Sequence, residues 1–361
     1  MKKIICSALA ALLLVTSACG KGSADPTTAP SSEPSPSATP ALPSPSPTPT
    51  APPYTNPLTG EGMDEDISGN RPWAIMINNL DKALPQCGVS QADIIYEIPA
   101  EGGVTRMMAI FSDISDVEAI GSMRSIRPYY ADVGLSYDAI VIHAGGSMES
   151  YTEMSRCGID HLDGVLGSYA SETFYRDPSR MGYGLEHSMF TTGEKLIAAA
   201  DGQGFDFEHD GDYDYRLTFS ENADKQCHEK AEYVQIAFNG YKTTSFTYDG
   251  DTGLYTAYEY GANYIDGNTD ENMTFTNVIV LTTSISVIDD VGRLSVKLTG
   301  SGSGYFICGG KSAEITWERN SNTEAFSYYL ADGTKLDLGI GATYIGIASK
   351  NDLSISFEKK S

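Results

Sequence analysis

A proline-rich segment near the N-terminus limits where this chain of 361 residues can fold. Twelve of its seventeen prolines lie between Pro26 and Pro57, and most of the residues around them are Ser, Thr and Ala. Such a segment cannot bury a core, and it extends at about 3 Å per residue, so residues 23–57 can span on the order of 100 Å. The folded part must therefore follow it, and we interpret residues 19–57 as a stalk.

The residues before the stalk are typical of an export signal. Lys2 and Lys3 precede an apolar run from Ile4 to Val15, and three small residues lie directly before Cys19. The run is shorter than the roughly 20 residues that a transmembrane helix needs. We predict a lipoprotein signal peptide at 1–18, lipidation of Cys19, and anchoring by acyl chains to the outer face of a cytoplasmic membrane at a Gram-positive-type cell surface. The alternative is an ordinary signal peptide with an unrelated cysteine nearby.

Charge and cysteine spacing exclude several kinds of partner. Cleavage after residue 18 would remove two lysines and no acidic residue, which changes the formal net charge from −24 to about −26. A chain this acidic is not drawn to nucleic acid or anionic lipid by bulk charge, so we expect no nucleic-acid partner. Seventy or more residues separate each of the four later cysteines from the next, in no cysteine–histidine cluster, and we expect no metal and no other cofactor. Both disulfides and free thiols remain open for these cysteines, which are Cys87, Cys157, Cys227 and Cys308.

Near residue 205 the sequence changes from alternating strand and helix candidates to strand candidates, which predicts an α+β protein with two domains. From 58 to 205, apolar strand candidates alternate with helix-like stretches, and we expect an α/β domain. An acidic linker at 206–231 leads to a β-rich, mostly antiparallel domain at 232–361. The strand candidates of the first domain are Trp73–Ile77, Asp93–Ile98, Thr105–Phe111 and Ala139–His143, and its helices are Arg127–Leu135, Ser147–Arg156 and Thr192–Ala200, the last opened by a capping box of Thr191 with Glu194. The strand candidates of the second are Tyr233–Phe238, Thr243–Tyr248, Tyr255–Tyr260, Thr274–Thr282, Arg293–Leu298, Tyr305–Cys308, Ala313–Glu318, Phe326–Leu330, Lys335–Leu338, Tyr344–Ala348 and Ser354–Phe357.

Basic side chains collect in the first domain although the whole chain is acidic. Seven of the ten arginines and three of the five histidines lie between Arg71 and His187. Arginine offers a planar fork of donors that fits phosphate or carboxylate, so Arg106, Arg124 and Arg127 are candidate ligand-binding residues. The alternative is that these arginines pair with Glu97, Glu101 or Asp113 and hold loops in place.

The segment from Asp138 to Ser147 reads as a strand, a glycine turn and a helix capped by Ser147. Ligands gather at the carboxyl ends of strands in open α/β sheets, and a helix start can bind an anion. We therefore add His143, Gly145, Gly146 and Ser147 to the candidate binding residues, with His143 able to hydrogen-bond or transfer a proton. The alternative is a tight turn that needs its two glycines, with His143 buried in the core.

Three further motifs have simpler interpretations. Glu186-His187 precedes a helix, but adjacency in sequence does not show contact in space. The acidic run from Asp206 to Asp214 lacks the final glutamate of a calcium-binding loop and is better explained as a linker. The run from Gly300 to Gly304 is interpreted as a flexible hairpin between strands.

Several segments together resemble the YerB family of bacterial lipoproteins, and the likeness covers almost everything after the stalk. They are Arg71-Pro-Trp-Ala-Ile-Met-Ile-Asn-Asn, Gln91-Ala-Asp-Ile-Ile-Tyr-Glu, Glu101-Gly-Gly-Val-Thr-Arg106, Gly121-Ser-Met-Arg-Ser-Ile-Arg127-Pro, His143-Ala-Gly-Gly-Ser147, Asn277-Val278, the Gly300–Gly304 loop, Thr316-Trp317 and the segment from Asp332-Gly333 to Tyr344-Ile345. The resemblance implies two domains, a lipid anchor and an unknown function, and it transfers no catalytic residue. At Ala257 and at 263–266 the chain departs from that family's pattern of a basic residue and a histidine.

Three functions follow as hypotheses. The first is a non-enzymatic module that binds an anionic envelope component, such as a cell-wall polymer, or a wall-associated protein. The second is a cell-envelope enzyme acting on a phosphodiester or pyrophosphate linkage, with His143 or His187 in proton transfer; because no nucleophile or metal cluster is visible, it ranks lower. The third is a structural interaction protein whose β domain supplies the binding surface. The sequence identifies neither the ligand nor the oligomeric state, and it leaves glycosylation of the stalk open.

Overall fold

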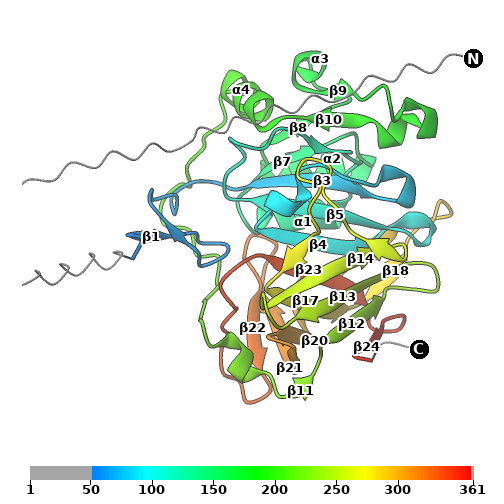
Figure 1. Cartoon of the computed structure of the whole chain (residues 1–361). Helices are drawn as coiled ribbons and strands as arrows, with labels where there is room; N and C mark the ends of the chain where they lie inside the picture. The colour runs from blue at the N-terminus through cyan, green and yellow to red at the C-terminus, as the bar shows by residue number, and fades with distance from the viewer. Residues whose placement is uncertain (1–50, 359–361) are drawn as a thin grey trace, which may run out of the picture. The chain divides into compact units, whose positions relative to one another are not determined.

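One mixed β-sheet organises the computed structural model, which describes residues 51–358 (Figure 1). The predicted signal peptide, Cys19 and most of the stalk lie outside the described residues. The sheet has eleven strands in the order β11-β21-β20-β17-β23-β4-β5-β3-β7-β8, with β22 paired to β21. Its strands are β3 (Trp73–Asn79), β4 (Ile94–Pro99), β5 (Thr105–Phe111), β7 (Ile140–His143), β8 (His161–Asp163), β11 (Glu229–Lys230), β17 (Asn277–Thr283), β20 (Gly300–Cys308), β21 (Lys311–Arg319), β22 (Ser327–Leu330) and β23 (Thr343–Ser349).

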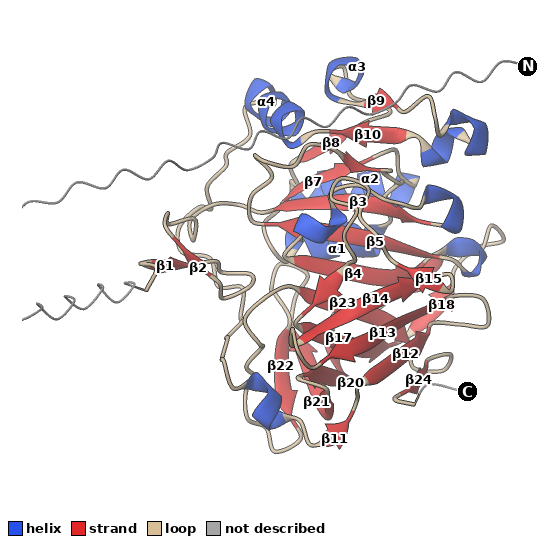
Figure 2. Cartoon of the chain, in the orientation of Figure 1, coloured by secondary structure: helices blue, strands red, loops and turns tan. Residues whose placement is uncertain are grey.

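Smaller sheets and short helices complete the structure (Figure 2). A six-stranded sheet contains β12 (Tyr233–Ala237), β13 (Thr243–Asp249), β14 (Leu254–Glu259), β15 (Ala262–Asn263), β16 (Thr274–Phe275) and β24 (Ser354–Ser356). The other sheets pair β1 (Tyr54–Thr55) with β2 (Gly62–Met63), β18 (Ile285–Val287) with β19 (Leu294–Val296), and β10 (Met189–Thr191) with both β6 (Ile120–Gly121) and β9 (Tyr175–Arg176). The α-helices are α1 (Pro128–Leu135), α2 (Met148–Cys157), α3 (Ala170–Thr173) and α4 (Gly193–Gln203), and the 3-10 helices are η1 (Asp81–Ala83), η2 (Val89–Gln91), η3 (Glu101–Gly103), η4 (Met181–Tyr183), η5 (Leu185–His187) and η6 (Ala223–Gln226).

The central sheet runs through both halves of the chain. Strand β23, near the C-terminus, pairs in parallel with β4, and the register runs from Thr343 opposite Ile94 to Gly346 opposite Glu97. Contacts group the chain from Thr50 to Ser361 into one compact unit, which contains every described sheet. We therefore treat residues 50–361 as a fragment that folds by itself. The predicted fold class is confirmed, because a helix-bearing mixed-sheet region precedes a mostly antiparallel one.

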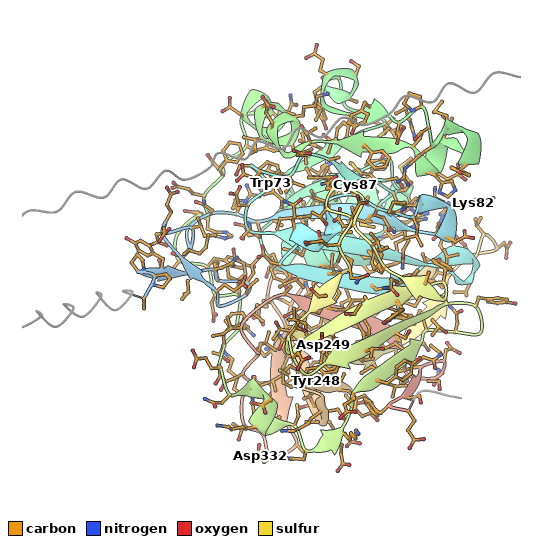
Figure 3. All side chains as sticks on the ribbon, viewed as in Figure 1. Trp73, Lys82, Cys87, Tyr248, Asp249 and Asp332 are labelled. Atoms are coloured by element: carbon orange, nitrogen blue, oxygen red, sulfur yellow. The ribbon has the colours of Figure 1, made fainter. Side chains whose placement is uncertain are left out.

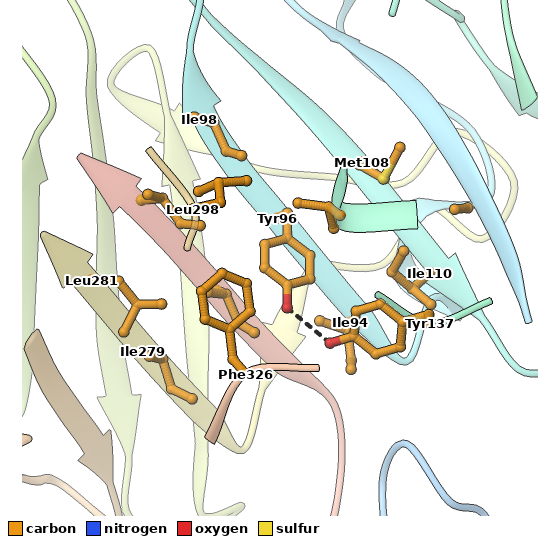
Figure 4. Close-up of a cluster of buried hydrophobic side chains, with 14 of the residues drawn as sticks. Ile94, Tyr96, Ile98, Met108, Ile110, Tyr137, Ile279, Leu281, Leu298 and Phe326 are labelled. Carbon is orange, nitrogen blue, oxygen red and sulfur yellow. Dashed lines mark hydrogen bonds between the residues drawn. The ribbon is translucent and has the colours of Figure 1, made fainter. Parts of the chain in front are cut away.

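Two hydrophobic cores lie on opposite faces of the central sheet. All seven residues of β3 are buried, and because side chains alternate along a strand, Ala74 and Met76 enter one core while Ile75 and Ile77 enter the other. Helices α1 and α2 cover the first face, whereas the six-stranded sheet and α4 cover the second. Figure 4 shows part of the first core, where the Tyr96 and Tyr137 hydroxyl groups meet at 2.8 Å.

Three local predictions are wrong for identifiable reasons. Gly300–Gly304 belongs to strand β20 rather than to a flexible loop. Its glycines have a packing role, since a Cβ at Gly302 would lie 2.5 Å from the indole nitrogen of Trp317 on the neighbouring strand. The N-cap of α4 is Thr192, whose hydroxyl accepts from Lys195 N at 3.2 Å, while Thr191 ends β10. Lys335–Leu338 forms only isolated bridges, to Tyr329 and Phe219.

The structure distinguishes between the alternatives for the four cysteines and for the acidic run. All four cysteines are free, and Cys227 and Cys308 are buried. Within residues 51–358, which include the acidic run, no group of three or more His, Cys, Asp or Glu side chains could hold a metal ion. His209 from this run is instead buried, and its Nδ1 lies 2.8 Å from the Asp138 carboxylate. No helix in the described part of the chain is long and apolar enough to cross a membrane.

A buried charged cluster joins the central sheet to the six-stranded sheet. Glu97 on β4 and Glu259 on β14 are at most 1% exposed, and the Lys242 ammonium contacts Glu259 and lies 3.6 Å from Glu97 Oε1. The Thr244 hydroxyl lies 2.8 Å from Glu97 Oε2 and 2.9 Å from Glu259 Oε1. Tyr344 from β23 donates to Glu97 Oε2 at 2.6 Å. The two sheets are therefore held together by charge as well as by apolar packing.

Seven strands of the central sheet point the same way and end at one edge. β7 runs parallel to β3 and to β8, and β23 runs parallel to β17 and to β4. β3 and β4 are both antiparallel to β5, and β17 and β21 are both antiparallel to β20, so the strands of each pair are parallel to each other. This carboxyl-end edge is on the right in Figure 1, and Figure 3 shows Lys82 there, just after β3. Strand β1, near the start of the described chain, lies at the opposite side. Ligand sites in α/β sheets favour such an edge.

Candidate functional site

Two segments predicted to bind a ligand lie side by side at the carboxyl-end edge. The stretch that leads into α1 runs along the glycine turn after β7: Ile126 N donates to Gly145 O at 2.9 Å, and Ala144 N donates to Arg124 O at 3.1 Å. The Ser125 hydroxyl also donates to Ala144 O at 3.0 Å. The backbone therefore brings the segment that contains Arg124 and Arg127 next to the His143–Ser147 turn.

Two of the three candidate arginines are held by one carboxylate. Glu101, at the start of η3, accepts from Arg106 Nη2 at 2.9 Å and from both Nη2 and Nε of Arg127, the latter at 3.2 Å. Arg106 also donates to the Ser125 carbonyl, and Arg127 Nη1 donates to Ile126 O at 2.8 Å. These bonds match the alternative in which arginines hold loops in place. Arg106 and Arg127 therefore have few donors left for a ligand.

The charge balance of this cluster is positive. Burial would raise the pKa of Glu101, but the hydrogen bond from Arg127 and the charge of Arg106 together lower it to about 2, so Glu101 is ionised. Burial and the neighbouring Arg127 charge lower the pKa of Arg106 to about 10, which leaves it protonated at neutral pH. Arg106, Arg124 and Arg127 thus carry three positive charges, and the one carboxylate that forms ion pairs within this group is Glu101. This local excess of positive charge occurs in a chain whose net charge is −24.

Arg124 differs from its two neighbours because its guanidinium forms no hydrogen bond or ion pair with any residue of the described chain. Its side chain is half-buried, and burial lowers its pKa, an effect that the Glu186 carboxylate opposes and the charge of Arg127 reinforces. A half-buried guanidinium without a partner keeps five donors that are only partly solvated. Arg124 is therefore the member of the cluster that is best able to bind an incoming anion.

His143 is enclosed rather than presented to solvent. It is 0% exposed; its Nδ1 lies 2.9 Å from Gly145 O and its Nε2 lies 3.0 Å from His161 Nδ1. Because a carbonyl only accepts, Nδ1 of His143 carries the proton, and Nε2 accepts from His161. Both ring nitrogens are thus used inside the protein. His143 would reach a ligand only after the turn rearranged, and in the present geometry it positions Gly145.

The glycine turn is also braced from within. Gly145 adopts φ of +75°, a conformation that favours glycine, and its N–H donates to Asp163 Oδ1 at 2.8 Å. Gly146 has no room for a side chain, since a Cβ there would lie 2.7 Å from Ser150 Oγ. Ser147 caps α2 and accepts from Ser150 N at 3.2 Å. The helix start predicted as an anion site therefore has some of its N–H groups already bonded.

Sequence reasoning missed the residues that support this turn. Asp163, at the end of β8, is 2% exposed and accepts from the Tyr151 hydroxyl at 2.6 Å as well as from Gly145. His161 stacks on His143 with ring centroids 5.1 Å apart. A pattern of strand, capped helix and second short strand could have indicated them, because parallel neighbours end at the same edge.

His187 lies near the site, but it is buried too. It is 3% exposed, and its Nδ1 lies 3.1 Å from Asn78 Nδ2, which also donates to Glu186 O at 2.8 Å. Burial lowers its pKa, and the neighbouring Glu186 carboxylate opposes that shift. The Glu186–His187 segment thus folds over the end of β3 and brings its carboxylate toward Arg124.

Taken together, fold and site define a class: an α+β protein with a partly open arginine cluster where its parallel strands end. Comparison with known proteins then places the chain in a family. The family described as "Protein of unknown function (DUF3048)" matches with its N-terminal domain over residues 58–206 and with its C-terminal domain over residues 234–345. The chain is a member of this YerB-like family.

Two comparisons connect the chain to one relative from Bacillus subtilis (strain 168). The protein named "Putative lipoprotein YerB" is 27% identical over 300 residues, which cover 82% of this chain and 86% of that protein. The crystal structure of the Bacillus subtilis YerB protein matches with a TM-score of 0.72 and 26% identity, over 84% of this chain and 99% of that one. The chain is therefore lipoprotein-like, and its family has no established function.

Proposed function

We propose that this protein is lipidated at Cys19, is held at the outer face of the cytoplasmic membrane, and binds an anionic envelope component through Arg124. The observation that carries the proposal is the guanidinium of Arg124, which has no partner in residues 51–358 although Arg106 and Arg127 beside it are both paired with Glu101. A phosphate or carboxylate group would supply the missing acceptors in the bidentate geometry that arginine favours.

The ligand we expect is a phosphate-bearing component of the envelope, because phosphate oxygens match the donors of a guanidinium.

The enzyme alternative receives less support from the geometry. It needs His143 or His187 to move a proton, and general acid–base catalysis requires the group to reach the substrate. His143 has no exposed surface and both of its nitrogens are bonded, while His187 is 3% exposed. We therefore propose binding without turnover.

The test is a titration of residues 50–361 with a short poly(glycerol phosphate). We expect saturable binding that Arg124→Gln weakens at least about tenfold, because a hydrogen bond to a charged group contributes about 1.5–3 kcal/mol. The matched control is Arg156→Gln, which removes an arginine whose side chain is 61% exposed at the far end of α2. An equal loss of affinity in both variants would show that binding depends only on the overall charge of the protein. Product formation by the wild-type fragment would favour the enzyme hypothesis.

A further inference from the structure

A groove begins at the residue that follows Glu101 of the arginine cluster. It has a volume of about 300 Å³, and Gly102 and Gly103 of η3 form part of its wall. The residue before them is Glu101, which holds Arg106 and Arg127. The groove therefore begins on the same short element that organises the cluster.

The lining of this groove is mainly apolar. Six of its residues are Pro99, Ala100, Phe238, Ile285, Val287 and Leu294. Its only charged lining residue is Asp352, which is exposed. A groove of this composition fits hydrocarbon better than a sugar or a peptide backbone, whose polar groups would lose their hydrogen bonds to water there.

One wall of the groove is formed by the hairpin of β18 and β19, and several apolar side chains of this hairpin are exposed to solvent. Val287, Ile288 and Val291 are 64%, 55% and 70% exposed. Arg293 on this hairpin donates to Glu149 Oε1 at 3.0 Å, and Glu149 lies in the first turn of α2. The ion pair ties the hairpin to the helix that follows the glycine turn, and Ala144 of that turn donates to Arg124 O.

Other apolar side chains are exposed at the same edge. Met148, the first residue of α2, is 75% exposed, and Leu166, just after β8, is 70% exposed. Apolar side chains gathered at one place on a soluble protein mark a binding surface more often than an accident of folding. Exposed apolar side chains therefore occur on the elements that adjoin the glycine turn as well as on the hairpin.

We propose that the ligand is a lipid phosphate with a single aliphatic chain, whose head binds Arg124 and whose chain lies in the groove. This inference rests on the proposed function and specifies its ligand class. We choose phosphate over carboxylate because the three acceptor oxygens of a phosphate match the five donors of the unpaired Arg124 guanidinium better than the two oxygens of a carboxylate do. Charge complementarity and an apolar groove at one site together define an amphiphile.

The experiment compares dodecyl phosphate, methyl phosphate and dodecanoate, each below its critical micelle concentration, by titration into residues 50–361. We expect dodecyl phosphate to bind at least about tenfold more tightly than methyl phosphate, a gain that roughly two buried methylene groups supply. Dodecanoate should bind more weakly than dodecyl phosphate. Arg124→Gln should weaken both phosphates.

Two variants of the hairpin separate the groove from the arginine. Val287→Asp places a charge in the groove lining and should weaken dodecyl phosphate about tenfold while leaving methyl phosphate unchanged. Val291→Asp adds the same charge to the same hairpin outside the lining and should change neither. Circular dichroism spectra and melting curves check that each variant is folded.

The possible failures have distinct meanings. If methyl phosphate binds through Arg124 but the dodecyl chain adds nothing, or if Val287→Asp has no effect, the lipid inference is wrong while the anion site stands. If dodecanoate equals dodecyl phosphate, the phosphate assignment is wrong. If neither phosphate binds and Arg124→Gln changes nothing, the proposed function itself fails.

Discussion

Lys242→Met should lower the free energy of unfolding by about 3–5 kcal/mol, the usual cost of removing one partner from a buried ion pair. Lys242 is 2% exposed, and Glu97 and Glu259 are 0% and 1% exposed. Burial lowers the pKa of Lys242, and the adjacent Glu97 opposes this shift. Without the ammonium, no positive charge would balance the two buried carboxylates. Glu97 would keep the neutral donors Asn79, Thr105 and Tyr344, whereas Glu259 would keep at most the Thr244 hydroxyl, which has only one proton to donate.

Urea unfolding of residues 50–361 measures this effect, and two further variants test its cause. Lys230→Met removes a 76% exposed lysine that pairs with Glu232, and it should cost less than about 1 kcal/mol. Adding Glu259→Gln to Lys242→Met removes one of the uncompensated charges and should restore part of the loss. If Lys242→Met unfolds within about 1 kcal/mol of the wild type, the cluster does not hold the two sheets together.

The second large effect is a loss of stability in mild acid that depends on His143. Burial lowers the pKa of His143 to about 4, although the Asp163 carboxylate opposes the shift, and the ordinary value is 6.5. Between pH 6.5 and pH 4 the unfolded chain therefore binds a proton that the folded chain does not, so stability falls as the pH falls through this window and levels off below it. At about 1.4 kcal/mol per pKa unit, the loss amounts to about 3 kcal/mol.

Unfolding curves at several pH values compare the wild type with His143→Gln. Glutamine can still donate to Gly145 O, but it does not titrate, so its curve should be flatter between pH 6.5 and pH 4. Glu101 adds a separate loss at lower pH, from about 4.5 down toward 2, because its pKa is lowered in the folded state. Parallel curves for the two proteins between pH 6.5 and pH 4 would show that His143 is not buried as a neutral imidazole.

Much of the fold can be read from local pattern. The run Trp73–Ile77 is apolar throughout, and it is buried on both faces of the sheet, as such runs in parallel sheets are. The predicted helix starts near Arg127 and Ser147 are confirmed, because Pro128 and the Ser147 side chain are strong local signals. The proximity of Arg124 to Gly145 was only a condition of the sequence interpretation, because the backbone hydrogen bonds that create it join segments about twenty residues apart.

What escaped prediction depends on contacts between residues far apart in sequence. Lys242 pairs with Glu97 across 145 positions, and nothing in either local segment indicates this. The glycines at 300–304 suggest a flexible loop when the sequence is considered alone, because the reason for them is the packing of Trp317 against Gly302 across two neighbouring strands. Whether Arg124 is free while Arg106 and Arg127 are paired depends on where Glu101 points, which no sequence pattern determines.

The central claim is that Arg124 is the open member of an anion-binding cluster. Crystals of residues 50–361 soaked in selenate, an anion visible by its anomalous scattering, test it most directly. The predicted result is an anomalous selenium peak beside Arg124, with a selenate oxygen about 2.7–3.2 Å from a guanidinium nitrogen, and the absence of this peak from Arg124→Gln crystals. A guanidinium of Arg124 ion-paired with Glu186, and selenate bound only elsewhere, would contradict the claim.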